Sequence, residues 1–200
     1  MNLKLAKGKA LVVVAHPDDE TIWMGGTMQK NANVEWTIFS LCRSDDKDRA
    51  PRFRSVVKIY KANGIISDLE DEGRLGLMES IPEIEKRLIS KLMAKNFDYI
   101  FTHGKNGEYG HERHKGVYLA VKNLLRVHKL QAKKFYTFAY EIHKSDQYAI
   151  PQKRADFDIK LSDRVYKNKL NLIQNIYGFN PDSFESKSCS KIEKFNIFNI

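Results

Sequence analysis

The chain has 200 residues, of which 42% are hydrophobic and 30% are charged. This composition is too apolar for a disordered chain and too polar for a bundle of membrane-spanning helices. The two cysteines, Cys42 and Cys189, are too few for a disulfide framework, and their spacing does not resemble a CxxC metal site. The length suits one compact domain, and we expect a single domain over residues 1–200.

The formal net charge is +9. Nucleic-acid-binding proteins usually gather basic residues on one face, whereas here Lys and Arg alternate with acids, as in residues 45–54 and 153–164. We therefore expect a solvated Lys-rich surface and no nucleic-acid partner, with an anionic small substrate as the second interpretation. The longest apolar run near the start, residues 10–15, is too short for a signal peptide or a spanning helix. The sequence thus predicts a cytoplasmic protein without a membrane anchor.

Predicted strands and helices alternate along the chain. Residues 8–15 are a continuous β-branched and apolar run, which is typical of a strand buried on both faces of a parallel sheet. The expected strands are 8–15, 34–42, 97–103 and 134–142. The expected helices are 20–33, 52–63, 81–97, 111–129 and 163–177. This alternation predicts an α/β fold, with a mostly parallel sheet between helices.

Local signals predict where some of these elements begin and end. Gly64 is well placed to cap the C-terminus of the helix over 52–63. Pro82 suits the first turn of the helix over 81–97. Residues 178–200 are polar, rich in Asn and weakly patterned, and they predict no clear element.

Two segments with histidines directly follow predicted strands, where functional groups collect in parallel sheets. The first segment, residues 16–20, reads His-Pro-Asp-Asp-Glu. Three successive carboxylates repel one another unless a cation or a helix N-terminus compensates. The second segment, residues 111–114, reads His-Glu-Arg-His and puts both imidazoles on one helical face. A helix cap explains the acids alone and chance explains the histidine pair alone, but the two segments together favour a metal site.

If the strands over 8–15 and 97–103 are neighbours, His16, an aspartate and one of the later histidines can converge on one cation. Two imidazoles and one carboxylate bind Zn²⁺ or a similar divalent ion and leave a position open for water. Such a site predicts metal-assisted hydrolysis, in which a carboxylate that is not a ligand takes the proton of the attacking water.

These segments also resemble a known family. LVVVAHPDDE (11–20) resembles the signature of the LmbE-like, or GlcNAc-phosphatidylinositol de-N-acetylase (PIG-L), family of zinc deacetylases. FTHGKNGEYGHERH (101–114) resembles the family's later segment, which ends in a His-x-x-His. The resemblance implies a Rossmann-like fold and zinc-dependent hydrolysis of an N-acetyl group, on an N-acetylglucosamine-type sugar or its conjugate.

The resemblance assigns roles to five residues. It implies that His16, Asp19 and His114 are the metal ligands. It makes Asp18 the general base that activates the attacking water. It makes His111, as an imidazolium, the group that stabilises the tetrahedral oxyanion.

The substrate side of the resemblance is weaker. Arg52 stands where the family often carries a substrate-contacting arginine, but the acid that usually follows it is missing from residues 51–55. Asp71 resembles the family's sugar-contacting aspartate. Tyr109, in the glycine-rich loop, is a further candidate for a substrate oxygen. The +9 charge gives weak support to an anionic conjugate such as a phosphate-bearing sugar.

Several neighbouring residues have two interpretations. Glu20 either caps the helix start or supports the site, and His103 is either a supporting group or an ordinary strand-end residue. Trp23 is expected in the core or in the wall of the pocket. Two other functions stay open, namely a basic anion- or nucleic-acid-binding protein without catalysis and a different metal-dependent amide or phosphoester hydrolase.

Overall fold

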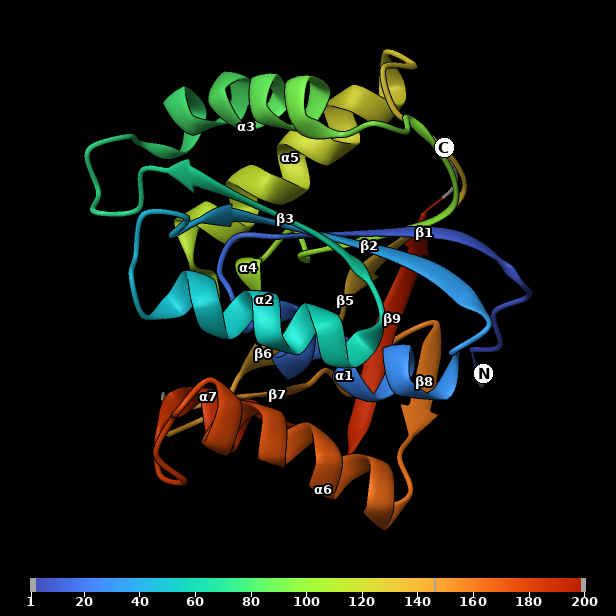
Figure 1. Cartoon of the computed structure of the whole chain (residues 1–200), viewed down its shortest axis with the longest axis vertical. Helices are drawn as coiled ribbons and strands as arrows, with labels where there is room; N and C mark the ends of the chain where they lie inside the picture. Colours follow the sequence, from blue (N-terminus) through green and yellow to red (C-terminus); the bar gives the residue numbers. More distant parts are fainter. Residues whose placement is uncertain (1–2, 146, 199–200) are drawn as a thin grey trace.

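The structure is a computed structural model that describes residues 3–145 and 147–198 (Figure 1). The strands are β1 (Gly8–Val14), β2 (Val34–Cys42), β3 (Asn63–Leu69), β4 (Asn96–Thr102), β5 (Gln131–Phe138), β6 (Tyr140–Ile142), β7 (Ala149–Pro151), β8 (Phe157–Lys160) and β9 (Ile192–Phe198). The helices are α1 (Asp19–Lys30), α2 (Arg49–Tyr60), α3 (Leu77–Lys91), α4 (Gly107–Gly110), α5 (Glu112–Arg126), α6 (Asp163–Asn171), the π-helical η1 (Leu172–Ile176) and α7 (Phe184–Ser188).

One seven-stranded sheet organises the fold, in the order β3-β2-β1-β4-β5-β9-β8. Strands β1 to β5 are parallel, whereas β9 runs antiparallel to β5 and β8 runs antiparallel to β9. This confirms the predicted single-domain α/β fold with a mostly parallel sheet. The chain moves outward from β1 to β3 and then returns to the other side of β1 as β4. Such a switch point opens a crevice at the carboxyl ends of the two strands, where ligands bind in this class of fold.

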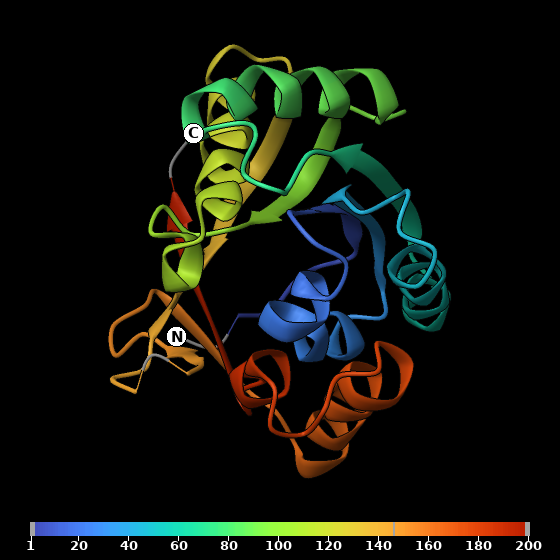
Figure 2. The ribbon, with the colours of Figure 1, turned by 90° about the vertical axis from the view of Figure 1, so that its left-hand side faces the viewer.

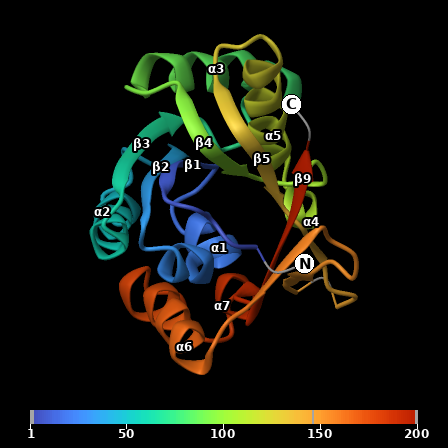
Figure 3. The same ribbon diagram turned by 90° about the vertical axis from the view of Figure 1, so that its right-hand side faces the viewer.

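Helices cover both faces of the sheet (Figures 2 and 3). Helices α3 and α5 pack on one face, and α1 and α2 pack on the other, with α6 lying outside α1. The side chains of β1 alternate between the two apolar cores: Val12 and Val14 join the core under α1, and Leu11 and Val13 join the core under α5. The continuous apolar run of β1 is therefore explained by burial on both faces.

Two predictions about element ends were wrong. Helix α2 ends at Tyr60 and is capped by Lys61, which has the left-handed φ of 54°, whereas Gly64 lies in β3. Strand β3 was not predicted, because as an edge strand it is mostly exposed and has little apolar pattern. Helix α3 begins at Leu77, so Pro82 lies inside the helix and not in its first turn.

The C-terminal segment 178–200 is also more regular than expected. It contains α7 and β9, and β9 pairs with β5 on one side and β8 on the other. Its pattern is obscured because Glu193, a charged residue, is fully buried in β9 with its carboxylate against the buried ammonium of Lys169 at 2.8 Å. A buried charge at a core position hides the strand from a search for apolar alternation.

Over the described parts of the chain, we find no helix with both the length and the apolar character that a membrane crossing demands.

Candidate functional site

The site lies at the carboxyl ends of β1 and β4, the switch point of the sheet. The loop after β1 carries His16 and leads through Asp18 into helix α1. The carbonyl of Asp18 accepts the first helical hydrogen bonds, from the amides of Thr21 at 2.8 Å and Ile22 at 2.9 Å. Asp18 itself has φ 122°, a region that non-glycine residues rarely adopt. Backbone strain of this kind concentrates at functional sites, because the surrounding structure must hold it in place.

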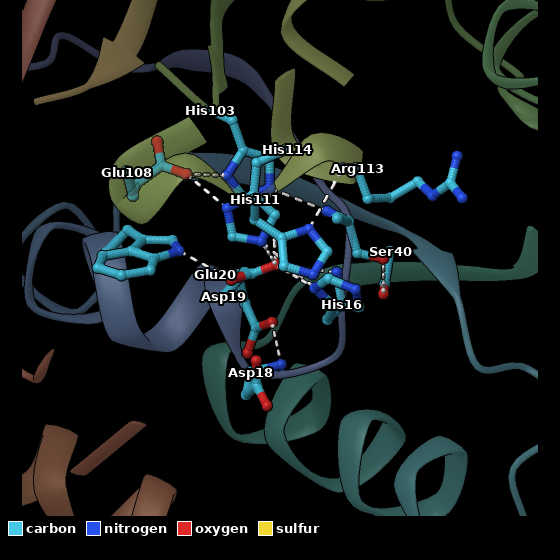
Figure 4. Close-up of polar contacts among 12 residues, drawn as sticks. His16, Asp18, Asp19, Glu20, Ser40, His103, Glu108, His111, Arg113 and His114 are labelled. Atoms are coloured by element: carbon cyan, nitrogen blue, oxygen red, sulfur yellow. Dashed lines mark hydrogen bonds and ion pairs between the residues drawn. The ribbon is translucent and has the colours of Figure 1, made fainter. Parts of the chain in front are cut away.

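Three ligand-type atoms from two distant segments face one another (Figure 4). His16 Nδ1 lies 3.3 Å from Asp19 Oδ2. His114 Nε2 lies 3.4 Å from the same oxygen and 3.3 Å from His16 Nδ1. These atoms come from the start of α1 and the start of α5, as the two sequence segments predicted.

The size of this triangle fits a tetrahedral metal ion. When each bond from metal to ligand is about 2.0–2.1 Å, two ligand atoms of a tetrahedral site lie about 3.3–3.4 Å apart. Two imidazole nitrogens and one carboxylate oxygen are also ligands that Zn²⁺ accepts. With three protein ligands, such a site keeps a position for water or substrate. The residues present therefore fit a catalytic divalent ion.

His114 is oriented by a buried carboxylate that the sequence analysis missed. Glu108 Oε2 lies 2.6 Å from His114 Nδ1 and 2.7 Å from His103 Nδ1. His103 Nε2 accepts the amide of Ala15 at 3.0 Å, so the His103 proton is on Nδ1 and is donated to Glu108. If His114 likewise donates its Nδ1 proton to Glu108, its Nε2 lone pair is left facing the triangle. Carboxylates of this kind set the tautomer of metal-binding histidines.

The other two members of the triangle have partners as well. His16 Nε2 lies 2.9 Å from Asp71 Oδ2, so the carboxylate of Asp71 orients His16 as Glu108 orients His114. The second oxygen of Asp19, Oδ1, accepts the indole N–H of Trp23 at 2.8 Å. Burial raises the pKa of Asp71, but the hydrogen bond and charge of His16 outweigh that effect and lower the pKa to about 2.

Asp18 lies beside the triangle and is not part of it. Its Oδ2 accepts a hydrogen bond from Arg49 Nη1 at 2.6 Å. Burial and the adjacent charge of Asp19 raise the pKa of Asp18 well above its usual range, against the opposing charge of Arg49. Two neighbouring carboxylates thus have different surroundings, one facing the histidines and the other facing an arginine, which is what different chemical roles require.

The hydrogen bonding of His111 favours the neutral imidazole, whereas the resemblance implied an imidazolium. Its Nδ1 accepts the amide N–H of Arg113 at 3.2 Å, so the proton of the neutral ring is on Nε2. Burial and the charges of His114 and His16 lower the pKa of His111 to about 4. His111 can therefore donate a hydrogen bond from Nε2 without carrying a positive charge.

A cavity of about 300 Å³ opens over these groups. Trp23, Tyr109 and Phe184 give it an aromatic side. Among the described residues that line it, carboxylates outnumber arginines: the acids are Asp18, Asp19, Asp46, Asp71 and Glu185, and the arginines are Arg43 and Arg49. The positive net charge of the chain is therefore not gathered in this cavity.

The structure brings six of the eight predicted site residues to the lining of this cavity. His114 is fully buried and joins the site through the ligand triangle beneath the lining, and Arg52 is the other exception. Arg52 is not among the described lining residues, because its side chain bonds Asp48 at 2.7 Å and the carbonyl of Ile176 at 3.0 Å. Arg49, one turn earlier on α2, lines the cavity instead. The sequence offers several arginines between residues 43 and 54, and only the position of α2 decides which one faces the site.

Glu20 and His103, each of which has two interpretations from the sequence, are both fully buried. Glu20 Oε1 accepts the hydroxyl of Tyr177 at 2.8 Å, so Glu20 supports the start of α1 from below the cavity. His103 stacks on His114 with ring centroids 3.8 Å apart. One feature of the sequence could have indicated Glu108: it is an acid in the glycine-rich loop between two histidines. Acids in loops are too common for this feature to single it out.

A curated relative, the uncharacterized protein L374 of Acanthamoeba polyphaga mimivirus, is 23% identical over 185 residues, which is 84% of this chain and 78% of the relative. The solved structure of the 4-carboxy-2-hydroxymuconate hydratase GalB from Pseudomonas putida matches with a TM-score of 0.65 at 12% identity, over 96% of both chains.

Two deacetylases share the fold at similar distance. A deacetylase of the teicoplanin biosynthesis pathway has a TM-score of 0.60 at 11% identity, over 85% of this chain and 84% of its own. The A40926 pseudoaglycone deacetylase Dbv21 has a TM-score of 0.60 at 12% identity, over 86% of this chain and 83% of its own. At such identities these structures establish the fold alone.

The family itself is established by sequence. Residues 11–125, which contain both histidine segments and the strands that carry them, match the model of the GlcNAc-PI de-N-acetylase family, PIG-L. With more than half of its length in that match, the chain belongs to the PIG-L family.

Proposed function

We propose that this protein is a zinc-dependent deacetylase that hydrolyses the N-acetyl group of an N-acetylglucosamine-type sugar or conjugate. One observation carries the proposal: the ligand atoms of His16, Asp19 and His114 form a triangle with sides of 3.3–3.4 Å beside a carboxylate that is not part of it. Membership of the PIG-L family supports deacetylation as the reaction, and the fold that the chain shares with two antibiotic-pathway deacetylases is consistent with it.

His16, Asp19 and His114 would hold the ion. When bound, a divalent ion lowers the pKa of water and polarises a carbonyl group. The chain's own contribution is to hold the ligands rigidly, with Asp71 behind His16 and Glu108 behind His114. Such supporting carboxylates raise metal affinity and keep each ring in the orientation that binding needs.

Asp18 is the proposed general base. Its carboxylate takes a proton from the attacking water, and the same group can return that proton to the departing amine, so no net proton is gained by the protein. Arg49 holds one oxygen of Asp18, which leaves the other carboxylate oxygen for proton transfer. The products are acetate and a free amine.

His111 and Tyr109 are the proposed donors to the reacting acetyl oxygen. The neutral His111 offers its Nε2 proton, and a donor that already points at developing negative charge stabilises it without reorganising. Tyr109 lines the same cavity, and burial raises the pKa of its hydroxyl, which keeps it protonated as a donor.

The cavity suits a small polar ligand better than a highly charged one. A volume of about 300 Å³ is at the lower end of ligand pockets. Its aromatic side offers a face for a sugar ring, while its acids outnumber its arginines. We therefore propose a neutral N-acetylated sugar ring in the cavity, and we revise the weak expectation of an anionic group there.

Acetate release is the decisive measurement. The zinc-loaded protein is expected to release acetate from one or more of a set of N-acetylglucosamine conjugates, to lose that activity to a chelator and to regain it with added Zn²⁺. Release of phosphate without acetate indicates a phosphoester hydrolase. Tight, salt-dependent binding of a polyanion with no hydrolysis indicates a binding protein, and either result contradicts the proposal.

A further inference from the structure

Asp18 is held at its backbone amide by residues from opposite ends of the chain. The amide of Asp18 donates to Glu20 Oε2 at 3.1 Å. The other oxygen of Glu20 accepts the hydroxyl of Tyr177 at 2.8 Å. Glu20 is 0% and Tyr177 is 3% exposed, so water does not compete for these hydrogen bonds. Tyr177 follows η1 and lies outside residues 11–125 that match the family.

A second set of contacts links the carboxylate of Asp18 to the turn that carries Tyr177 and Phe179. Arg49 Nη1 donates to Asp18 Oδ2 at 2.6 Å, and the Arg49 guanidinium lies 4.3 Å from the centre of the Phe179 ring. A guanidinium over an aromatic face is attracted by the ring and loses freedom to swing away. Phe179 therefore limits the positions from which Arg49 can reach Asp18.

The turn that carries Tyr177 and Phe179 is itself fixed. Gly178 has φ 80°, a conformation open to glycine, and a Cβ there would overlap Arg52 Nη1. The same Arg52 nitrogen donates to the carbonyl of Ile176 at 3.0 Å. Arg52 was expected to touch substrate, but its guanidinium packs against this turn instead. Because Gly178 has no side chain, the guanidinium can approach the backbone of the turn closely.

Asp18 needs such support because its backbone is strained. With φ 122°, it would relax to a common conformation if its surroundings permitted, and a strained residue persists only where several contacts agree on its position. The amide and the carboxylate of Asp18 are the two groups that would move in that relaxation, and each is tied to the same C-terminal turn.

We propose that Tyr177 and Phe179 are positioning residues that fix the conformation of Asp18, Tyr177 through Glu20 and the Asp18 amide, and Phe179 through Arg49 and the Asp18 carboxylate. The inference rests on the proposed function, because Asp18 is the base of that reaction. It extends the working site beyond the residues that line the cavity.

The first test is Tyr177→Phe in the zinc-loaded protein, since the substitution removes only the hydroxyl. We expect kcat to fall about tenfold, because a small misplacement of a reacting group has effects of this size or larger. KM and zinc stoichiometry should stay unchanged. Tyr99→Phe is the matched control, because it removes another tyrosine hydroxyl. That hydroxyl accepts a hydrogen bond from the amide of Ala6, 93 residues away in the sequence, at 3.1 Å. The control should leave kcat unchanged.

A double-mutant cycle separates positioning from general weakening of the fold. If Tyr177 acts through Asp18, Tyr177→Phe should cause no further loss of residual activity in an Asp18→Asn background. An equal loss in both backgrounds, or a wild-type kcat in the single variant, overturns the inference.

Phe179→Leu tests the link from Phe179 through Arg49 to Asp18. It is also the variant to use if Tyr177→Phe does not fold well. It keeps an apolar side chain and removes the ring, and we expect kcat to fall about threefold, as for a cation–π contact at a partly exposed position. An unchanged kcat overturns this link.

Failure of the proposed function is distinguishable from failure of the inference. If the wild-type protein releases no acetate from any conjugate, the proposed function fails. The inference is then decided by crystal structures of the zinc-loaded wild-type and Tyr177→Phe proteins. Loss of the positive φ at Asp18 in the variant supports it, and an unchanged Asp18 contradicts it.

Discussion

The two parts of the chain on either side of residue 125 contribute to the site in different ways. Residues 11–125 supply the three proposed ligand side chains, the proposed base and the carboxylates behind the histidines. Residues after 125 supply Phe184 and Glu185 at the cavity wall, and they also supply Glu193, which accepts hydrogen bonds from the middle of helix α1. The proposed chemical groups thus all lie in the first part, whereas the groups that hold them in position come from both parts of the chain.

Helix α1 shows what the residues after 125 contribute to the site. The helix is interrupted at Met24, which has φ −147°. Glu193, in β9, accepts two backbone amides, from Gly26 at 2.8 Å and Thr27 at 2.7 Å, and also the Thr27 hydroxyl at 2.6 Å. Lys169 balances the buried charge. A helix with two adjacent glycines and a break gains its conformation from distant residues as well as from its own propensity.

The comparison predicts that the largest losses of activity come from the first part of the chain. His114→Ala removes one corner of the ligand triangle, and we expect zinc to be lost and turnover to fall by more than roughly 10³-fold. Metal analysis of the purified variant and acetate release measure both effects. His128→Asn is the control, because that histidine is exposed at the end of α5 and its φ of 55° is one that Asn tolerates. Stoichiometric zinc in His114→Ala would exclude it as a ligand.

Asp18→Asn should separate binding from chemistry. The substitution keeps the size of the side chain and removes its ability to take a proton, so we expect zinc to be retained and kcat to fall by about 10²–10⁴-fold. The change is measured by steady-state kinetics with zinc content determined in parallel. Asp45→Asn, an exposed position in the loop after β2, should leave kcat unchanged. Full activity in Asp18→Asn rules out the proposed base.

A substitution in the second part of the chain should act on stability first. Glu193→Ala leaves the Lys169 ammonium buried without its carboxylate and three donors of α1 without an acceptor. Breaking a buried pair in this way costs about 3–5 kcal/mol of the free energy of unfolding. Denaturant unfolding measures it, with Glu35→Ala, an exposed acid on β2, as the control. A loss under about 1 kcal/mol would show that this network does not hold α1.

The smallest effect is expected for a supporting carboxylate. Glu108→Gln keeps a side chain of similar shape but weakens its hold on His114 Nδ1 and His103 Nδ1. Losing such a partner typically weakens metal affinity by about 10–100-fold, and a competition titration with a chelator of known affinity measures the change. Glu112→Gln is the control, because Glu112 lies between His111 and His114 in the sequence and has no side-chain partner among the described residues. Equal affinities in the two variants would mean that Glu108 does not orient His114.

Much of the first part was predictable because its signals are local. The buried strand β1 is visible as an apolar run, and His16, Asp19 and His114 stand in short segments directly after strands. Position after a parallel strand is enough to place a residue at the carboxyl edge of the sheet, so the convergence of these segments followed once β1 and β4 were taken as neighbours.

Tertiary structure decided the rest. The choice of Arg49 over Arg52 depends on the rotation of α2, and the neutral form of His111 depends on the amide that its Nδ1 accepts. Strand β9 and the turn at Tyr177 could not be predicted, because a buried Glu193 and a single tyrosine hydroxyl gain their meaning only from partners more than 150 residues away. Short-range patterns determine which groups take part in the chemistry, whereas long-range packing determines their exact positions, because those positions are set by contacts that no local sequence contains.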